Sequence, residues 1–581
     1  MKSETPETAL RKRIQQERAR QQVVTPDEVY QRISSGEIVR AVGNLLFHTG
    51  PVGLGKKLEV VLDKVSKAYM RGHIGLQMHI LDFLVRLSIG LRSFLPHWII
   101  LKELDADAVA DIAQRVSNAL SKLIEVEGKA PVKVAARLRQ ETIARLKAEG
   151  ISDDTEAAAM ADRLMGDSLT DYVCNIISEL QSSNLIKVAE SRLRGETQTQ
   201  LGNDYAAFLQ YVIWLGGSFV TTNPVLVKLA WEIDPELWNK QVEDLIATRY
   251  TPDQLRELLK GPQGELDAAI ETINSMVTMA VVEENCRLLR DIFLVTEGRE
   301  GYVSLQVNPK NHSDSKQMIT EAKNLYAHLQ ERLGGVPNVV FKLPATAAGK
   351  CAAKELTSEG IGVTITVEFA VFQALGFGEV LNRGKMLTAY LALMNGRMAY
   401  PVRDEMKQKG VKGGVEAARW AGVEVARKVY RRLYEPPEKG GMGVDRERVK
   451  LLIASLRIYD DWIPDISELW GSPVMTIFPN VRRKFDSRQR DFSDKAVLKA
   501  TPAKEMDILS KSEIFRQAWW VPADAERFKP KRVITLEPQD SDALAEWPPV
   551  ANTLGQFIDL YQQMGEKVTE RMECLSELTR A

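Results

Sequence analysis

A lysine stands inside an apolar run in the stretch NVVFKLPAT, residues 338–346. Three apolar residues lead directly into Lys342, and the chain turns at Pro344. Lysine is rarely buried, because removing its ammonium from water is costly. Apolar surroundings favour the neutral amine, and a neutral amine can attack a carbonyl carbon to form a Schiff base. The pattern makes Lys342 a candidate nucleophile. The alternative is an edge-strand lysine that prevents aggregation.

Other polar residues stand within or at the end of apolar runs in the same way. Arg397 and Arg457 could clamp a phosphate, because a guanidinium matches phosphate oxygens in a fork; salt bridges at a rim are the alternative. Asp204 could serve as an acid or base in carbon–carbon bond chemistry, or cap the helix that follows it. The candidate site residues at strand ends are Asp204, Asn223, Ser304, Gln306, Lys342, Thr364, Thr366, Arg397, Ser455 and Arg457.

Composition restricts the classes of partner. The chain has 581 residues and a net charge of -1, which gives no general electrostatic case for nucleic acid or a membrane surface. Four cysteines without a C-x-x-C pair, and only six histidines, argue against a structural zinc site. We expect no metal and no cofactor.

Two segments bear on location. The first 22 residues are charged throughout and lack the apolar core of a secretory signal. The most apolar stretch, 211–227, is interrupted by Gly216, Gly217 and Pro224. It predicts a helix, a turn and a strand rather than a membrane span. We expect a cytoplasmic protein.

The elements that must position these residues fall into three regions. Residues 1–195 carry apolar residues at helical spacing and predict an all-α region. Residues 196–490 alternate short β-rich runs with helices, and 491–581 form an extension that ends in a long amphipathic helix, which could cross the barrel mouth. The predicted strands are 197–204, 218–224, 301–309, 338–346, 361–369, 386–397, 450–457 and 472–480.

Eight strands with helical crossovers predict a (β/α)8 TIM barrel, in which active residues gather at the C-terminal ends of the strands. A doubly wound open sheet is the rival, but no G-x-G-x-x-G follows any strand. A closed barrel has no edge strand, so the aggregation-blocking interpretation of Lys342 weakens.

Residues 197–482 resemble the transaldolase family. The similarity is carried by FKLPAT at the fourth strand, TTNP at 221–224, ASLR at 454–457 and MTIFPN at 475–480. It implies that Lys342 is the Schiff-base nucleophile and that Asp204 handles the proton of the substrate hydroxyl at carbon–carbon cleavage. Asn223 would bind the dihydroxyacetone part, and Thr366 would position the catalytic water. Arg397 and Arg457, with Ser455 beside them, would hold the phosphate.

The chain departs from the family's pattern at several places. Gln306 stands where a glutamate is usual, and a similar glutamine occurs in the related fructose-6-phosphate aldolases. Ala392, Thr364 and Met394 also differ from the residues common in the family. Glu368 is an unexpected acid in the fifth strand. Because side chains alternate along a strand, we expect it to point the same way as Thr366. Asp204 is the first candidate to supply the proton step in place of the missing glutamate, and Glu368 is the second if it faces the cavity.

The resemblance implies an enzyme that transfers a dihydroxyacetone unit between sugar phosphates, as in the pentose phosphate pathway. The alternatives are an aldolase of the fructose-6-phosphate type, which releases dihydroxyacetone, and a non-catalytic barrel that acts as a binding or regulatory module. We expect sugar phosphates as partners, without nucleic acid or membrane. The apolar face of Leu58, Val61, Leu62 and Val65 needs a cover, so residues 1–195 would form a homo-oligomer or close the barrel mouth.

Overall fold

The computed structural model describes residues 5–577 apart from 224–227, 229–230 and 233–234. Its centre is a closed barrel of eight parallel strands in the order β1 to β8, and β1 pairs with β8. The (β/α)8 prediction is confirmed. The strands are β1 (Gln200–Asn203), β2 (Phe219–Thr221), β3 (Tyr302–Gln306), β4 (Val339–Pro344), β5 (Val363–Glu368), β6 (Ala389–Leu393), β7 (Val449–Ile453) and β8 (Val474–Ile477).

Each observed strand overlaps a predicted range and is shorter than it, and β7 begins at Val449, just before its predicted start. Residues 218–224 were predicted as one strand, but β2 ends at Thr221, and Pro224 lies outside the described residues. The strand residues are almost all buried, because helices cover the outer face of the barrel while side chains fill its interior.

Helices surround the barrel and fill the long connections. Between β2 and β3 the chain builds an insertion that the sequence reasoning did not separate from the barrel. The helices of the barrel region are α11 (Leu209–Trp214), α13 (Pro235–Ala247), α14 (Pro252–Lys260), α15 (Gln263–Val295), η2 (Pro309–Asn311), α16 (Ser315–Leu333), α17 (Ala347–Ser358), α18 (Val371–Asn382), α19 (Asn395–Gln408), α20 (Gly414–Ala418), α21 (Ala421–Tyr434), η3 (Pro437–Lys439), α22 (Pro464–Ser467) and α23 (Pro479–Asp486).

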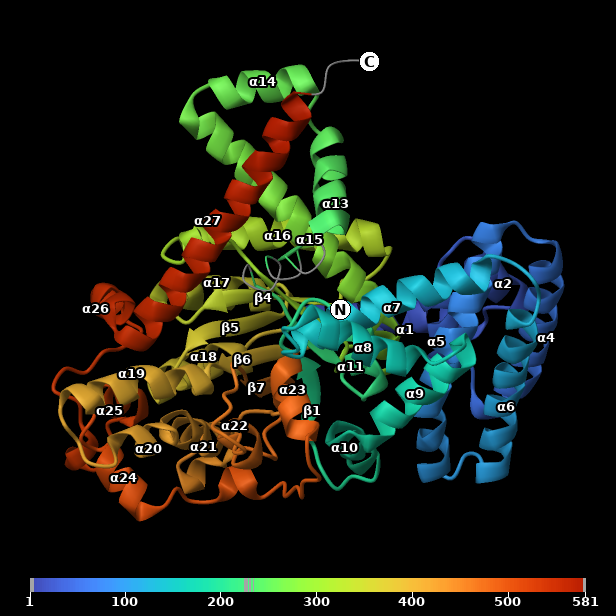
Figure 1. Cartoon of the computed structure of the whole chain (residues 1–581). Helices are drawn as coiled ribbons and strands as arrows, with labels where there is room; N and C mark the ends of the chain where they lie inside the picture. The colour runs from blue at the N-terminus through green and yellow to red at the C-terminus, as the bar shows by residue number, and fades with distance from the viewer. Residues whose placement is uncertain (1–4, 224–227, 229–230, 233–234, 578–581) are drawn as a thin grey trace.

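The N-terminal region is helical, as predicted, and lies to one side of the barrel (Figure 1). The face of α4 that was expected to need a cover is buried inside this region, where α4 packs against α2, α5 and α6. That face therefore supplies no reason for oligomerisation. The helices are α1 (Pro6–Gln22), α2 (Pro26–Ser34), α3 (Ile38–Gly43), η1 (Asn44–His48), α4 (Pro51–Arg71), α5 (Ile74–Ile100), α6 (Ala106–Ile124), α7 (Ala130–Ala148), α8 (Asp154–Met165), α9 (Leu169–Ser182) and α10 (Asn184–Leu193).

One described helix, α5, is long and apolar enough to cross a membrane by length and composition alone. The sequence reasoning overlooked it in favour of residues 211–227. Half of its most apolar window is buried inside the protein, and α5 packs against α6, α7 and α9. This is the setting of a central core helix.

The C-terminal extension returns to the barrel. It comprises η4 (Ala496–Leu498), α24 (Ala503–Leu509), α25 (Glu513–Trp519), η5 (Glu526–Phe528), η6 (Pro538–Asp540), α26 (Ser541–Glu546) and α27 (Pro548–Ser576). The predicted long final helix is α27. It contacts β5 and continues to α14 (Figure 1).

The two ends of the barrel are closed by helices from opposite ends of the described chain. Ile14 of α1 is fully buried and packs with Phe219 and Tyr302, which begin β2 and β3. These residues mark the N-terminal end of the barrel. Within residues 1–195, α1 thus closes the opposite end of the barrel, and α27 lies over the mouth. Another part of this region reaches the mouth side, where Glu149 after α7 pairs with Arg482 of α23.

We expect Ile14→Ala to lower the free energy of unfolding by about 2–5 kcal/mol, because it leaves a cavity against the first residues of the strands. Lys12→Ala, on the exposed face of the same helix, should change it little. Thermal and urea unfolding would measure both. Equal stabilities of the two variants would show that α1 does not contribute to the barrel.

Candidate active site at the barrel mouth

Lys342 lies on β4, between Gln306 of β3 and Thr364 of β5 in the strand register. Its side chain is buried, with 4% of the residue exposed. The pKa of Lys342 is lowered to about 8. Burial is the main cause; the negative charge of Asp204 opposes it, and the positive charge of Arg397 adds to it. A substantial fraction of this amine is therefore neutral near pH 8. The neighbouring Lys354 lies exposed on α17, as expected.

A cavity of about 450 Å³ opens beside Lys342. Seven of the predicted site residues line it, from six different strands or the segments that follow them. The expectation that these polar strand ends converge is met for Asp204, Asn223, Lys342, Thr366, Arg397, Ser455 and Arg457.

Asp204 follows β1 and faces this cavity. Thr221 donates its hydroxyl hydrogen to Asp204 Oδ1, and the backbone N–H of Ser455 lies 3.4 Å from Oδ2. The nearest helix, α11, begins only at Leu209, with Phe208 as its cap. The helix-cap alternative is therefore ruled out, and the carboxylate is held in the mouth by two donors.

The two arginines lie close enough that the charge of Arg457, together with burial, lowers the pKa of Arg397 to about 10. Arg397 donates to the amide oxygen of Gln556, and its Nε is buried without a hydrogen-bond partner in the described part of the chain. The guanidinium of Arg457 donates to the carbonyl oxygens of Ser455 and Leu456. Neither arginine therefore depends on a carboxylate as in the salt-bridge alternative. Two like charges with a free donor suit an anion such as phosphate.

Asp465, which the sequence reasoning missed, joins the start of α19, which carries Arg397, to the segment after β7, which carries Arg457. Its Oδ2 accepts the backbone N–H of Arg457 at 2.7 Å, and Oδ1 accepts Asn395 Nδ2 at 2.5 Å. Between Asn395 and Arg397 lies Gly396, where an added Cβ would collide with the carbonyl oxygen of Ser455. The first turn of α19 and the segment after β7 are therefore in close contact, and only glycine fits there.

Ser455 adopts a left-handed backbone, with φ of +60°. Such a conformation costs energy in a residue other than glycine and is common at functional sites. Here it accompanies the approach of the Ser455 N–H to Asp204.

Four predicted candidates do not line the cavity: Ser304, Gln306, Thr364 and Glu368. Gln306 is directly opposite Lys342 in the register, and its side-chain oxygen is buried without a described hydrogen-bond partner. Ser304 and Thr364 are buried in the same manner. These three belong to the polar interior of the barrel around the lysine.

Glu368 requires a correction. We expected it to point the same way as Thr366, but the register of β5 against β6 shifts between Ile365 and Glu368. Val367 adopts a positive φ of 55°, which is rare for a β-branched residue and breaks the alternation of side chains. Glu368 is fully buried, and burial raises its pKa well above the usual range. Its carboxyl group contributes to raising the pKa of Tyr434 on the helix α21, in the layer outside the strands.

The cavity also contains residues that the sequence did not single out. Tyr400 lies one turn after Arg397 on α19, so helical spacing could have indicated it. Phe478 and Asn480 belong to the quoted MTIFPN motif but were given no role. Nothing local pointed to Asp465, because its partners are backbone and side-chain groups of other segments.

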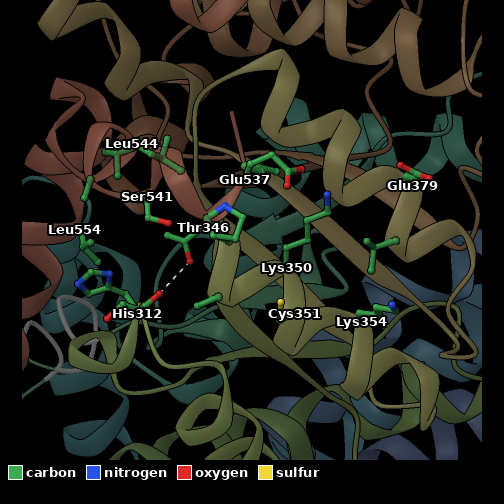
Figure 2. Close-up of a pocket in the computed structure, with 18 of the residues that line it drawn as sticks. His312, Thr346, Lys350, Cys351, Lys354, Glu379, Glu537, Ser541, Leu544 and Leu554 are labelled. Atoms are coloured by element: carbon green, nitrogen blue, oxygen red, sulfur yellow. Dashed lines mark hydrogen bonds between the residues drawn. The ribbon is translucent and has the colours of Figure 1, made fainter. Parts of the chain in front are cut away.

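A second cavity, of about 840 Å³, lies between α17, α18 and residues 536–554 of the extension (Figure 2). Lys350, Lys354 and Arg383 line it together with acids such as Glu537 and Glu379. It contains none of the predicted catalytic residues, and its charges are of both signs. The barrel mouth is therefore the better candidate active site.

A closed (β/α)8 barrel with a buried lysine on β4, and an acid and two arginines at its mouth, defines a class of barrel enzymes. The Transaldolase/Fructose-6-phosphate aldolase family matches residues 204–518, which is more than half of the chain. The chain belongs to this family. At its C-terminal end the family match reaches residue 518, whereas the resemblance seen in the sequence ended at residue 482.

Three relatives illustrate the similarity. Transaldolase 2 of Streptomyces avermitilis is 34% identical over 152 residues, which are 26% of this chain and 34% of the relative. The transaldolase of Neisseria meningitidis serogroup C is 25% identical over 310 residues, or 50% of this chain and 77% of the relative. The transaldolase of Acidothermus cellulolyticus is 30% identical over 265 residues, which are 42% of this chain and 67% of the relative. These relatives support an enzyme of the transaldolase and aldolase family.

We expect Asp465→Ala to raise the KM for a phosphorylated donor about ten- to a hundredfold, because two buried donors lose their acceptor. Asp465→Asn should retain most affinity. Its amide oxygen can accept the Arg457 N–H, and its amide hydrogens can reach Asn395 Oδ1, which is buried without a described partner. Steady-state kinetics would compare the two variants. Equal effects of both would argue against this hydrogen-bonding role.

Proposed function

We propose that the chain transfers a dihydroxyacetone unit from a ketose phosphate to an aldose phosphate through a Schiff base at Lys342. The observation that carries the proposal is the buried amine of Lys342, with a pKa of about 8, in a cavity shared with Asp204 and two arginines. A neutral amine is the reactive form for attack on a carbonyl. The family to which the chain belongs supports the same chemistry.

The first half of the reaction splits the donor. The Lys342 amine adds to the C2 carbonyl, and water leaves to form the imine. Asp204 then takes the proton of the C4 hydroxyl as the C3–C4 bond breaks. The bonding electrons pass to the protonated imine, which becomes a neutral enamine, and the shortened aldose phosphate departs.

The second half runs in reverse with a new aldehyde. The enamine carbon attacks the acceptor carbonyl, and the new hydroxyl oxygen receives a proton from Asp204. Water, positioned by Thr366, then hydrolyses the imine and restores the amine. Asn223 would hold the dihydroxyacetone hydroxyls, and Arg397 and Arg457 with Ser455 would hold the phosphate.

The second candidate is an aldolase of the fructose-6-phosphate type, in which water releases dihydroxyacetone without an acceptor. Gln306 favours it, because an amide opposite Lys342 can orient water but cannot take its proton. A barrel without catalytic activity is the remaining alternative. We also propose sugar phosphates as the partners, a place in the pentose phosphate pathway and a cytoplasmic location.

Borohydride trapping tests the three functions together. The full chain is incubated with fructose 6-phosphate, with and without an acceptor aldose phosphate, and the adduct on the Lys342 peptide is measured by mass. A trapped adduct with acceptor-dependent turnover supports transfer. A trapped adduct with free dihydroxyacetone in both cases favours the aldolase. No adduct with any ketose phosphate would refute both.

Lys342→Ala should lower turnover by several orders of magnitude, because the covalent route disappears. In the unmodified chain, the trapping rate should be half of its maximum at a pH of about 8. Below this midpoint it should fall about tenfold per pH unit, and above it the rate should level off, because only the neutral amine attacks. Lys354→Ala should leave both results unchanged. Borohydride labelling of Lys342→Ala would contradict the assignment.

Gln306→Glu should change the ratio of transfer to free dihydroxyacetone, because a carboxylate opposite Lys342 can exchange a proton with water or the amine. Glu368→Gln is the matched control, since Glu368 lies outside the cavity, and its turnover should stay within about twofold of wild type. Product ratios with and without acceptor would measure both. A constant ratio in Gln306→Glu would exclude this position from the proton relay.

A further inference from the structure

Two residues of the final described helix reach the candidate active site from outside the barrel. The ring of Phe557 on α27 lies 6.0 Å from Lys342 Nζ and 5.7 Å from Arg397 Cζ, measured to the ring centroid. Phe557 is fully buried. The neighbouring Gln556 accepts a hydrogen bond from Arg397 Nη1. One turn of α27 thus contacts both the proposed nucleophile and a proposed phosphate ligand.

The helix is fixed at this place by packing on both sides. Toward its C-terminal end, Met564 and Val568 are buried against Ile273 and Val277 of the insertion helix α15. Near its start, the ring of Trp547 lies 6.4 Å from that of Phe369, the residue after β5. The position of Phe557 over the mouth is therefore set by contacts that are independent of any substrate.

The open cavity beside Lys342 is bounded by the barrel and not by this helix. Its lining comes from the barrel strands, the segments that follow them and the helices α19 and α23, and no residue of α27 is part of it. Phe557 therefore forms a wall that covers one side of the lysine, and the cavity extends from Lys342 toward Arg397 and Arg457. The ring therefore lies against the lysine and Arg397 from outside the cavity.

This wall has one physical consequence. It removes water from around Lys342, and loss of hydration is the main reason for its lowered pKa, with Arg397 adding to the effect and Asp204 opposing it. The same turn of the helix also places the Gln556 amide oxygen where it accepts a hydrogen bond from the guanidinium of Arg397. Both residues of α27 lie beyond 204–518, the part of the chain that matches the family.

We propose that Phe557 and Gln556 are specificity-determining residues that complete the active site from α27. Phe557 covers Lys342 and keeps water from the imine, so that the bound unit passes to an acceptor instead of being hydrolysed. Gln556 orients Arg397 toward the phosphate. The proposal rests on the Schiff-base function described above. The alternative is that α27 is only a structural brace.

Three variants of the full chain separate these roles. Phe557→Ala removes the wall, Phe557→Leu keeps an apolar side chain, and Met564→Ala removes an equally buried side chain of α27 away from the mouth. We expect Phe557→Ala to increase release of free dihydroxyacetone relative to transfer, because water gains access to the imine. Phe557→Leu should restore most of the transfer. Met564→Ala should lower thermal stability without changing the product ratio.

A second measurement does not depend on any sugar reaction. Reductive methylation with formaldehyde and borohydride, followed by mass analysis of the Lys342 peptide, gives the pH midpoint of this amine. The midpoint should be about 8 in wild type and Met564→Ala, and at least about one unit higher in Phe557→Ala, because water regains access. The variants are compared by the pH midpoint and not by the methylation rate, since Phe557→Ala also lets formaldehyde reach Lys342 more easily.

The outcomes distinguish the two proposals. If no sugar phosphate is trapped but the midpoint still rises in Phe557→Ala, the Schiff-base function fails and the wall on Lys342 stands. If trapping succeeds and Phe557→Ala matches wild type in product ratio and midpoint, the role of Phe557 is overturned. If Phe557→Ala and Met564→Ala change the product ratio and the pH midpoint equally, α27 has only a structural role. Gln556→Ala should raise the KM for phosphorylated donors severalfold, and an unchanged KM would remove Gln556 from the site.

Discussion

Removal of water from the Lys342 amine is the constraint on which the rest of the structure depends. A lysine inside a barrel keeps a useful pKa only if burial is balanced by nearby charge, and here Asp204 opposes the combined effect of burial and Arg397. The strands bring the acid, the lysine and the arginines to one end. The helices α1 and α27 close the two ends of the barrel. The pKa of Lys342 therefore depends on neighbouring protein groups more than on solvent.

The strands and most of the site were predictable from the sequence because the information is local. A polar residue after an apolar run, such as Lys342 after Phe341, marks a strand end, and parallel strands in a barrel deliver these ends to one face. The combination of FKLPAT with ASLR then gave the roles. Seven predicted residues line one cavity because this rule requires only the strand order and the period of two.

The features that the sequence did not reveal depend on contacts between distant segments. Glu368 was misplaced because one residue, Val367, leaves the extended conformation and reverses the side-chain direction. Asp465 carries no motif, and its role exists only where the start of α19 meets the segment after β7. The long amphipathic helix α27 was recognisable, but which of its side chains would face Lys342 depends on the packing of α27 against the insertion.

The pairing of β1 with β8 has a consequence for how the enzyme is made. A ribosome completes β1 long before β8, so the growing chain holds an open sheet edge until the last strand arrives. The helix α27 follows later still. During synthesis the Lys342 side chain lies in water, and the burial that lowers its pKa is complete only after the last strand and α27 have packed.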